Sequence, residues 1–213
     1  MPYCETFVTP QQIYIGIWQL TETLDELITL WGKDDYPQHF IDARVDKRRC
    51  EILATALLLR NLIGDDVELR HAPNGCPIID SGYISISHTA THVAVALHAT
   101  RMVGVDIETI GNRAVRVAPR FMSPEELAHL PQEDSSIIDN TTPRTATIHI
   151  TWSVKEAVYK VFPSAIEFRR DIILSPIQAL PSGSVDVLLH NNSTCIEAHY
   201  TLYKGCSLAW VVR

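Results

Sequence analysis

The chain contains 213 residues, enough for one large domain or two small ones. Hydrophobic residues make up 46% and charged residues 20%, which is typical of a folded protein and excludes bulk disorder. The net charge of −7 argues against a general binder of nucleic acid or anionic membranes, because both need a basic surface.

The five cysteines include no C-x-x-C pair, which disfavours a disulfide framework and a zinc site. We therefore expect free thiols in the reducing cytoplasm. The first residues lack the basic start and apolar run of a secretory signal. The sequence contains no stretch of about 18 apolar residues, so we expect no membrane-spanning helix.

The first half of the chain alternates strand and helix signals. The β-branched and aromatic segment 12–20 predicts a strand, and Thr23 is placed to cap a helix over 24–31. Apolar residues at helical spacing predict a longer helix over 42–62 that Gly64 ends. Proline and glycine at 73–77 predict a turn. Three strands are expected next, over 83–87, 93–98 and 103–108.

The second half begins with helical signals and ends with strands. Ser123 and Pro124 predict a capped helix start, and the polar, proline-containing segment 131–147 predicts a mobile loop. A helix is expected over 150–162, followed by antiparallel strands within 172–180, 184–190, 195–203 and 207–213. Because each half pairs helices with strands, we expect an α+β protein with two lobes, 1–102 and 103–213.

Two acidic residues share one face of the strand predicted over 103–108. Strand alternation places Val105 and Ile107 on one side and Asp106 and Glu108 on the other. Their Cα atoms are expected to lie about 6–7 Å apart. Two carboxylates that close repel each other unless a cation lies between them, and Mg²⁺ prefers such oxygen ligands. The alternative is an edge strand with two solvated acids.

The helix predicted over 150–162 has one apolar stripe and one polar face. Trp152, Glu156 and Lys160 gather on the side opposite the stripe. Glu156 and Lys160 alone fit an ordinary surface ion pair. A tryptophan on that face is unusual, because it would expose a large apolar surface, and the wall of a cleft explains it better.

Other candidates are a histidine and two groups of basic residues. His88 follows two serines at a strand end, where it suits a phosphate ligand, an acid–base group or a hydrogen-bonded turn residue. A serine hydrolase is disfavoured because the chain has no G-x-S-x-G elbow. Basic side chains are concentrated in two places, Lys47-Arg48-Arg49 and the series Arg113, Arg116 and Arg120.

Together these segments resemble the 4′-phosphopantetheinyl transferase superfamily, in the family's order, over about residues 44–162. The most specific sign is the GVDIE strand followed by the W-S-x-K-E-A-x-x-K helix. The helix around Lys47-Arg48-Arg49-Cys50-Glu51 is similar to the family's basic helix. The matching pieces are Gly75-x-Pro77, Ser87-His88-Thr89, Gly104-Val105-Asp106-Ile107-Glu108, Arg120-Phe121-Met122-Ser123-Pro124-Glu125-Glu126 and Trp152-Ser153-Val154-Lys155-Glu156-Ala157-Val158-Tyr159-Lys160.

The resemblance implies two similar lobes related by a pseudo-twofold axis, with the active site in the cleft between them. It implies a Mg²⁺ ion held by Asp106, Glu108 and Glu156. It further implies catalytic roles for Glu156, Lys160 and Glu126, with either glutamate as the acceptor of the serine proton. Coenzyme A contacts are implied for a longer series: His88, Arg48, Arg49, Gly75, Cys76, Pro77, Ser87, Lys155 and Arg113.

Cys76 is the clear departure from the family pattern. The family often has a basic residue in G-[KR]-P, which helps to hold a coenzyme A phosphate, and Cys76 carries no such charge. Another basic residue, for which Arg113 is a candidate, would then compensate. The alternatives are weak coenzyme A binding and a degenerate paralogue that binds coenzyme A or a carrier protein with weak transfer.

The implied reaction is phosphoryl transfer from coenzyme A to a serine of an apo acyl or peptidyl carrier protein, with release of 3′,5′-ADP. Such catalysis is mostly positioning and electrostatic stabilisation. The partners implied are coenzyme A and an acidic carrier protein, with neither nucleic acid nor membrane, and the two-lobed form suggests a monomer. Another Mg²⁺-dependent phosphate-ester enzyme is an alternative that would use the same carboxylates.

Overall fold

The computed structural model describes residues 3–64, 67–132, 141–162, 167–178, 180–190 and 194–213. Its contacts divide the chain into two compact units, Met1–Arg101 and Met102–Arg213. Both units combine helices with antiparallel sheet, so the expected mixed α+β class is confirmed. Over the described ranges, no helix is both long enough and apolar enough to cross a membrane.

The first unit contains a four-stranded antiparallel sheet in the order β1-β2-β6-β5. The strands are β1 (Tyr3–Val8), β2 (Tyr14–Gln19), β5 (Tyr83–His88) and β6 (His92–His98). Three of them lie where the sequence predicts strands, whereas β1 was not predicted. All seven residues of β6 are buried, as befits a central strand.

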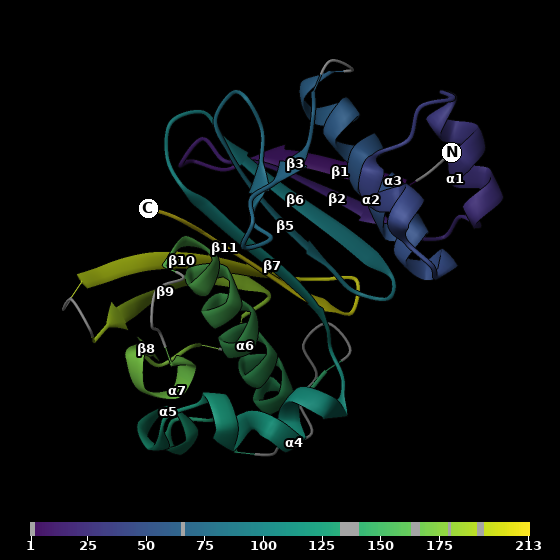
Figure 1. The fold of residues 1–213 in the computed structure, drawn as a ribbon. Coiled ribbons are helices and arrows are strands. Elements are labelled where there is room, and N and C mark those ends of the chain that lie inside the picture. Colours follow the sequence, from purple (N-terminus) through teal and green to yellow (C-terminus); the bar gives the residue numbers. More distant parts are fainter. Residues whose placement is uncertain (1–2, 65–66, 133–140, 163–166, 179, 191–193) are drawn as a thin grey trace. The chain divides into compact units, whose positions relative to one another are not determined.

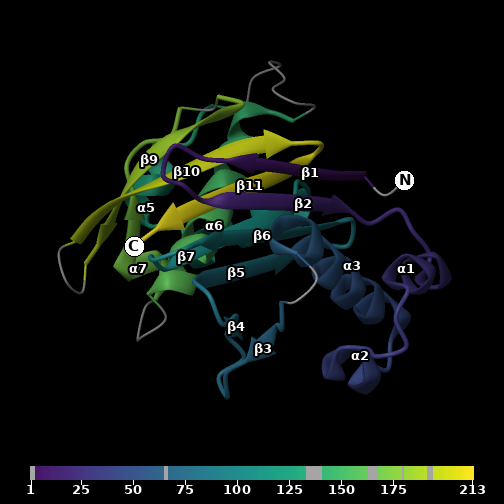
Figure 2. The same cartoon turned by 90° about the horizontal axis from the view of Figure 1, so that it is seen from above.

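Helices cover one face of this sheet (Figure 2). In α1 (Leu24–Trp31), Thr23 and Glu26 form the predicted cap, with each side chain bonded to the other's backbone amide. The helix expected over 42–62 is α3 (Asp46–Ile63), which begins slightly later than predicted, and the short helix α2 (Gln38–Asp42) before it was not predicted. Ala43 and Val45 adopt extended backbone angles between them, and Gly64 ends α3 as predicted.

A small hairpin follows α3. Its strands are β3 (Arg70–His71) and β4 (Pro77–Ile78), joined at the turn that the sequence predicts. Gly75 has a positive φ of 85°, which glycine adopts without the cost that a Cβ atom imposes.

The second unit contains a five-stranded antiparallel sheet in the order β7-β11-β10-β9-β8. Its strands are β7 (Val103–Thr109), β8 (Ile172–Leu174), β9 (Ser182–Leu189), β10 (Thr194–Tyr203) and β11 (Cys206–Val212). The long helix α6 (Pro143–Val161) lies across one face and shares the main core of this unit with the sheet (Figure 1).

Helix α6 begins earlier than the sequence predicts. Residues 143–147 were expected in a mobile loop, but Thr142 caps the helix through the Thr145 amide and Pro143 occupies its first position. Residues 133–140 of that expected loop lie outside the described residues. The short helix α5 (Pro124–Ala128) is capped by Ser123 as predicted, whereas α4 (Asn112–Phe121) and α7 (Phe168–Asp171) were not predicted.

Candidate functional site

Asp106 and Glu108 lie on the same face of β7, as strand alternation predicts. Their register partners on β11 are Ala209 and Ser207. Ala209 belongs to the core that α6 shares with the sheet, so both carboxylates face α6. Asp106 is only 4% exposed, which makes its charge costly unless a cation or hydrogen-bond donor compensates it.

Gly104 lets α6 approach β7 very closely. A Cβ atom at Gly104 would lie 2.0 Å from the carbonyl oxygen of Ala157, so a larger residue does not fit without moving the helix. The helix backbone therefore rests directly on the strand, and the α6 side chains next to Ala157 reach the carboxylates of β7.

Two side chains of α6 contact these carboxylates. Lys160 Nζ donates to Asp106 Oδ1 at 3.1 Å and to the Val105 carbonyl at 2.6 Å. Trp152 Nε1 donates to Glu108 Oε1 at 3.1 Å. The Trp152 ring also packs edge-on against Phe121, with ring centroids 4.8 Å apart. The polar face of α6 thus faces the acids of β7, and Trp152 is a hydrogen-bond donor there.

Burial, and after it the crowding of three acids, raises the pKa of Glu156 and Glu108. Burial is the main cause that raises the pKa of Glu156 to about 7; the Asp106 charge adds to it, and Lys160 opposes it. Burial and then Asp106 raise the pKa of Glu108, while the Trp152 hydrogen bond lowers it. One lysine therefore leaves an excess of negative charge, which favours the binding of a cation.

The chemistry of this donor set fits Mg²⁺. Three carboxylates supply the hard oxygen ligands that this ion takes. Among the residues that the structure describes, however, no three acidic, histidine or cysteine side chains converge into a ready-made metal shell. Asp106 and Glu108 are instead held by Lys160 and Trp152. The carboxylates are thus the type of ligand that Mg²⁺ prefers, but two of them accept hydrogen bonds from protein side chains.

Lys155 and Glu126 form an ion pair in the interior of the second unit. Lys155 Nζ lies 2.7 Å from Glu126 Oε2, and the two side chains are 0% and 5% exposed. The same Nζ donates to the carbonyls of Phe121 at 2.8 Å and Phe168 at 3.1 Å. Burial lowers the pKa of Lys155, and the Glu126 carboxylate opposes this.

Glu126 is bonded through both of its oxygens. Oε2 also accepts the Ser123 amide at 2.7 Å, and Oε1 accepts the Leu174 amide at 2.9 Å. The ion pair thus joins α5, α6 and β8. These contacts favour a role for Lys155 and Glu126 in holding α6 over a role in touching substrate.

In the first unit, the structure brings Arg48 and His88 together. Arg48 Nη1 lies 3.0 Å from His88 Nε2 and donates to Glu51 Oε2 at 3.0 Å. Arg49 is turned elsewhere, because its Nε donates to the Ala43 carbonyl at 2.9 Å. Of the two candidate arginines, Arg48 is therefore the one beside His88.

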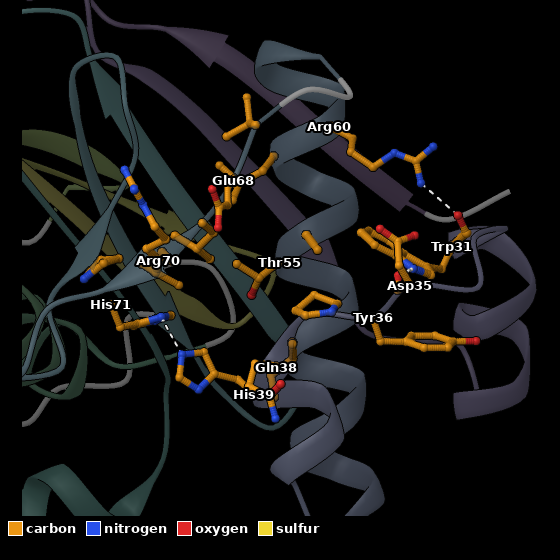
Figure 3. Close-up of a pocket in the computed structure, with 18 of the residues that line it drawn as sticks. Trp31, Asp35, Tyr36, Gln38, His39, Thr55, Arg60, Glu68, Arg70 and His71 are labelled. Carbon is orange, nitrogen blue, oxygen red and sulfur yellow. Dashed lines mark hydrogen bonds between the residues drawn. The ribbon is translucent and has the colours of Figure 1, made fainter.

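Arg48 and His88 are among the residues that line a cavity of about 870 Å³ within the first unit. This volume is within the range of small-molecule and cofactor sites. Figure 3 shows other residues that line this cavity. His39 and His71 lie next to each other in the lining of the cavity, and their rings are joined by a 2.8 Å hydrogen bond (Figure 3). The charged residues of the lining are Lys33, Asp35, Arg48, Arg60, Glu68 and Arg70, with His39, His71 and His88. Arginine and lysine thus outnumber acids in this lining although the whole chain is acidic.

The predicted Gly75-Cys76-Pro77 segment borders the same cavity. Gly75 and Pro77 are lining residues, whereas the side chain of Cys76 is exposed. Ser87 is buried in β5 beside His88. Arg113 lies in the second unit, exposed on α4, and its charge only slightly opposes the rise that burial causes in the pKa of Glu108.

Sequence reasoning missed four charged residues near these clusters. Glu51 is buried beneath Arg48, and Lys33, Arg60 and Arg70 line the cavity. A signal for Glu51 was present, because it lies three residues after Arg48 on a helix, where the two side chains become neighbours. The other three belong to segments that only the tertiary fold brings together.

Comparison with known protein families gives a match to the second unit. The sequence model of the 4′-phosphopantetheinyl transferase superfamily matches residues 102–211, more than half of the chain. The match includes Asp106, Glu108 and the whole of α6. No curated protein matches the chain. The match over this length shows that the chain belongs to the 4′-phosphopantetheinyl transferase superfamily.

Proposed function

We propose that this protein transfers 4′-phosphopantetheine from coenzyme A to a serine of an apo acyl or peptidyl carrier protein. The observation that carries the proposal is the cluster of Asp106, Glu108, Glu156 and Lys160, within the segment matched by the family. A phosphoryl-transfer site needs a cation-binding carboxylate set beside a fixed positive side chain, and this cluster supplies both.

The proposed Mg²⁺ ligands are Asp106, Glu108 and Glu156. When bound, the ion would supply charge stabilisation to the phosphate oxygens. Lys160, held by Asp106 and the Val105 carbonyl, adds a second positive charge near them. Both effects stabilise charge that develops in the transition state.

Glu156 is the proposed acceptor of the serine proton. Burial raises its pKa to about 7 before a cation is bound, and a bound Mg²⁺ would lower that pKa and keep the carboxylate ionised, as a proton acceptor must be. The serine oxygen bonds to the phosphorus that carries pantetheine, its proton passes to Glu156, and the bond to the departing 3′,5′-ADP breaks. Glu126 is the weaker candidate, because its two oxygens are already bonded to protein donors.

Coenzyme A is proposed to place its nucleotide in the cavity of the first unit. Arg48 and His88 are suited to a phosphate group, and Lys33, Arg60 and Arg70 add positive charge to the lining. These cations replace part of the positive charge that Cys76 does not supply. The implied pseudo-twofold relation of two lobes, and a shared cleft for transfer, are part of the same proposal.

The carrier protein is proposed to dock on α4. Arg113, Arg116 and Arg120 are exposed on this helix, while Ala118 and Phe121 are buried in a small core. Carrier proteins of this kind are acidic, so a basic helix face would attract them. None of the five cysteines forms a disulfide, which agrees with a reducing cytoplasmic location that we also propose.

The test is incubation of the protein with coenzyme A, Mg²⁺ and a panel of apo carrier proteins. Mass spectrometry should show that a carrier gains one phosphopantetheine. Coenzyme A binding without any transfer would indicate a degenerate family member. Hydrolysis of phosphate esters without a carrier would indicate a different Mg²⁺-dependent enzyme.

A further inference from the structure

Glu51 is a buried carboxylate outside the second unit's acidic cluster. It lies in the middle of α3, and the residue is only 6% exposed. It is absent from the cavity lining, although its helix neighbours Arg48 and Ile52 are part of that lining. Glu51 therefore has no direct route to a ligand in the cavity, and its burial needs another explanation.

Two cavity-lining side chains meet at Glu51. Arg48 Nη1 donates to Glu51 Oε2 at 3.0 Å, and His88 Nδ1 lies 3.5 Å from the same oxygen. The three side chains close a triangle, because the same Arg48 nitrogen is 3.0 Å from His88 Nε2. Arg48 and His88 remain 51% and 41% exposed, whereas Glu51 is 8% exposed.

This geometry determines where the His88 ring carries its proton. A guanidinium has only donors, so in the contact with Arg48 the Nε2 atom of His88 is the acceptor. The proton of the neutral ring is therefore on Nδ1, the nitrogen that faces Glu51. The Glu51 carboxylate thus stabilises one tautomer and one orientation of the ring.

We propose that Glu51 is a positioning residue that holds Arg48 and His88 together as an anion-binding pair at the cavity. The proposal rests on the proposed function in one respect, which is that the anion is a phosphate group of coenzyme A. Glu51 holds the Arg48 guanidinium and the His88 ring side by side at the cavity, with Nδ1–H of the ring toward Glu51. When an anion binds, a protonated His88 ring keeps this contact and donates Nε2–H to the anion beside Arg48. Such preorganisation improves affinity because less side-chain freedom is lost on binding.

Two substitutions separate this role from simple packing. Glu51→Met removes the carboxylate while keeping a side chain of similar length, and Glu51→Gln keeps an oxygen acceptor while removing the charge. Asp46→Asn is the matched control: Asp46 is on the same helix, pairs with Arg49, and is 76% exposed. Thermal unfolding verifies that each variant is folded. If Glu51→Met does not fold, Glu51→Gln takes its place in the measurements.

The first measurement uses no ligand. The ¹⁵N chemical shifts of the His88 ring, recorded above the pH at which it is protonated, report which nitrogen carries the proton. We expect the proton on Nδ1 in the wild type, Glu51→Gln and Asp46→Asn, and a change toward Nε2 in Glu51→Met. A wild-type ring protonated on Nε2, or a Glu51→Met ring like the wild type, would overturn the inference.

The second measurement is coenzyme A binding by calorimetry. Losing a hydrogen bond to a charged group should weaken binding by about tenfold in Glu51→Met, less in Glu51→Gln, and not at all in Asp46→Asn. The same Glu51→Met change in an Arg48→Ala, His88→Ala background should have almost no effect, because the groups it positions are gone. An equal loss in both backgrounds would assign Glu51 to packing and overturn the inference.

The two readouts also separate this inference from the proposed function. A wild-type protein that binds no coenzyme A, yet shows the Glu51-dependent Nδ1 tautomer, contradicts the proposed function and supports the positioning role. A protein that binds coenzyme A equally with and without Glu51 agrees with the proposed function and contradicts the positioning role.

Discussion

Replacing Glu156 by glutamine is expected to stabilise the protein at pH 8 while removing its activity. The folded state holds the Glu156 proton more tightly than the unfolded state, because burial and Asp106 raise its pKa from 4.5 to about 7. Stability contributed by the protonated form is complete below pH 4.5 and is lost as the pH rises to about 7. Glutamine resembles that protonated form at every pH.

The size of the gain follows from the same pKa. Each tenfold change in the dissociation constant corresponds to about 1.4 kcal/mol, so the full effect is at most about 3 kcal/mol. Glu156 is only partly buried, and solvent screening reduces the expected gain to about 1–2 kcal/mol. For a protein of this size, each kcal/mol raises the unfolding midpoint by about 2–4 °C.

The assay is thermal unfolding of wild type and Glu156→Gln without divalent ions, at pH 5 and pH 8. We expect a clear gain at pH 8 that becomes much smaller at pH 5. Glu197→Gln is the matched control, since that side chain is 55% exposed and should show no comparable gain. A Glu156→Gln protein no more stable than wild type at pH 8, or equally stabilised at both pH values, would refute the reasoning.

Three further predictions concern other parts of the molecule. Lys155→Met should cost about 3–5 kcal/mol in urea unfolding, because it leaves Glu126 buried without its cation, and adding Glu126→Gln should restore part of the loss. Arg116→Glu should raise the KM for an acidic carrier several-fold and leave coenzyme A affinity unchanged; an unchanged KM would exclude α4 as the docking helix. Cys76→Lys should tighten coenzyme A binding measured by calorimetry, whereas an unchanged Kd would show that other cations already compensate.

The parts of the fold predicted correctly are those with a local cause. Alternation in β7 places Asp106 with Glu108, and helical spacing places Glu156 with Lys160 on the polar face of α6. Caps such as Thr23 are read from adjacent residues, and the structure forms them. Such signals need no information about distant parts of the chain.

The errors arise where distant contacts override local pattern. The polar residues 143–147 suggest a loop, yet they become helix because Thr142 caps it and Ala146 is buried in the core. The helix expected from residue 42 begins only at Asp46, because Ala43 and Val45 adopt extended backbone angles and Arg49 Nε donates to the Ala43 carbonyl there. The sequence also gives no sign that Lys155 pairs with Glu126, because the two residues lie 29 positions apart in the chain.

The most direct test of the proposed function is the transfer assay with wild type, Asp106→Ala and Glu156→Gln, using coenzyme A, Mg²⁺ and apo carrier proteins. Each variant should unfold cooperatively, as a check that it is folded. We predict that the wild type adds one phosphopantetheine to a carrier serine and that both variants lose this activity. Full activity in either folded variant would contradict the assignment of the carboxylate cluster to catalysis.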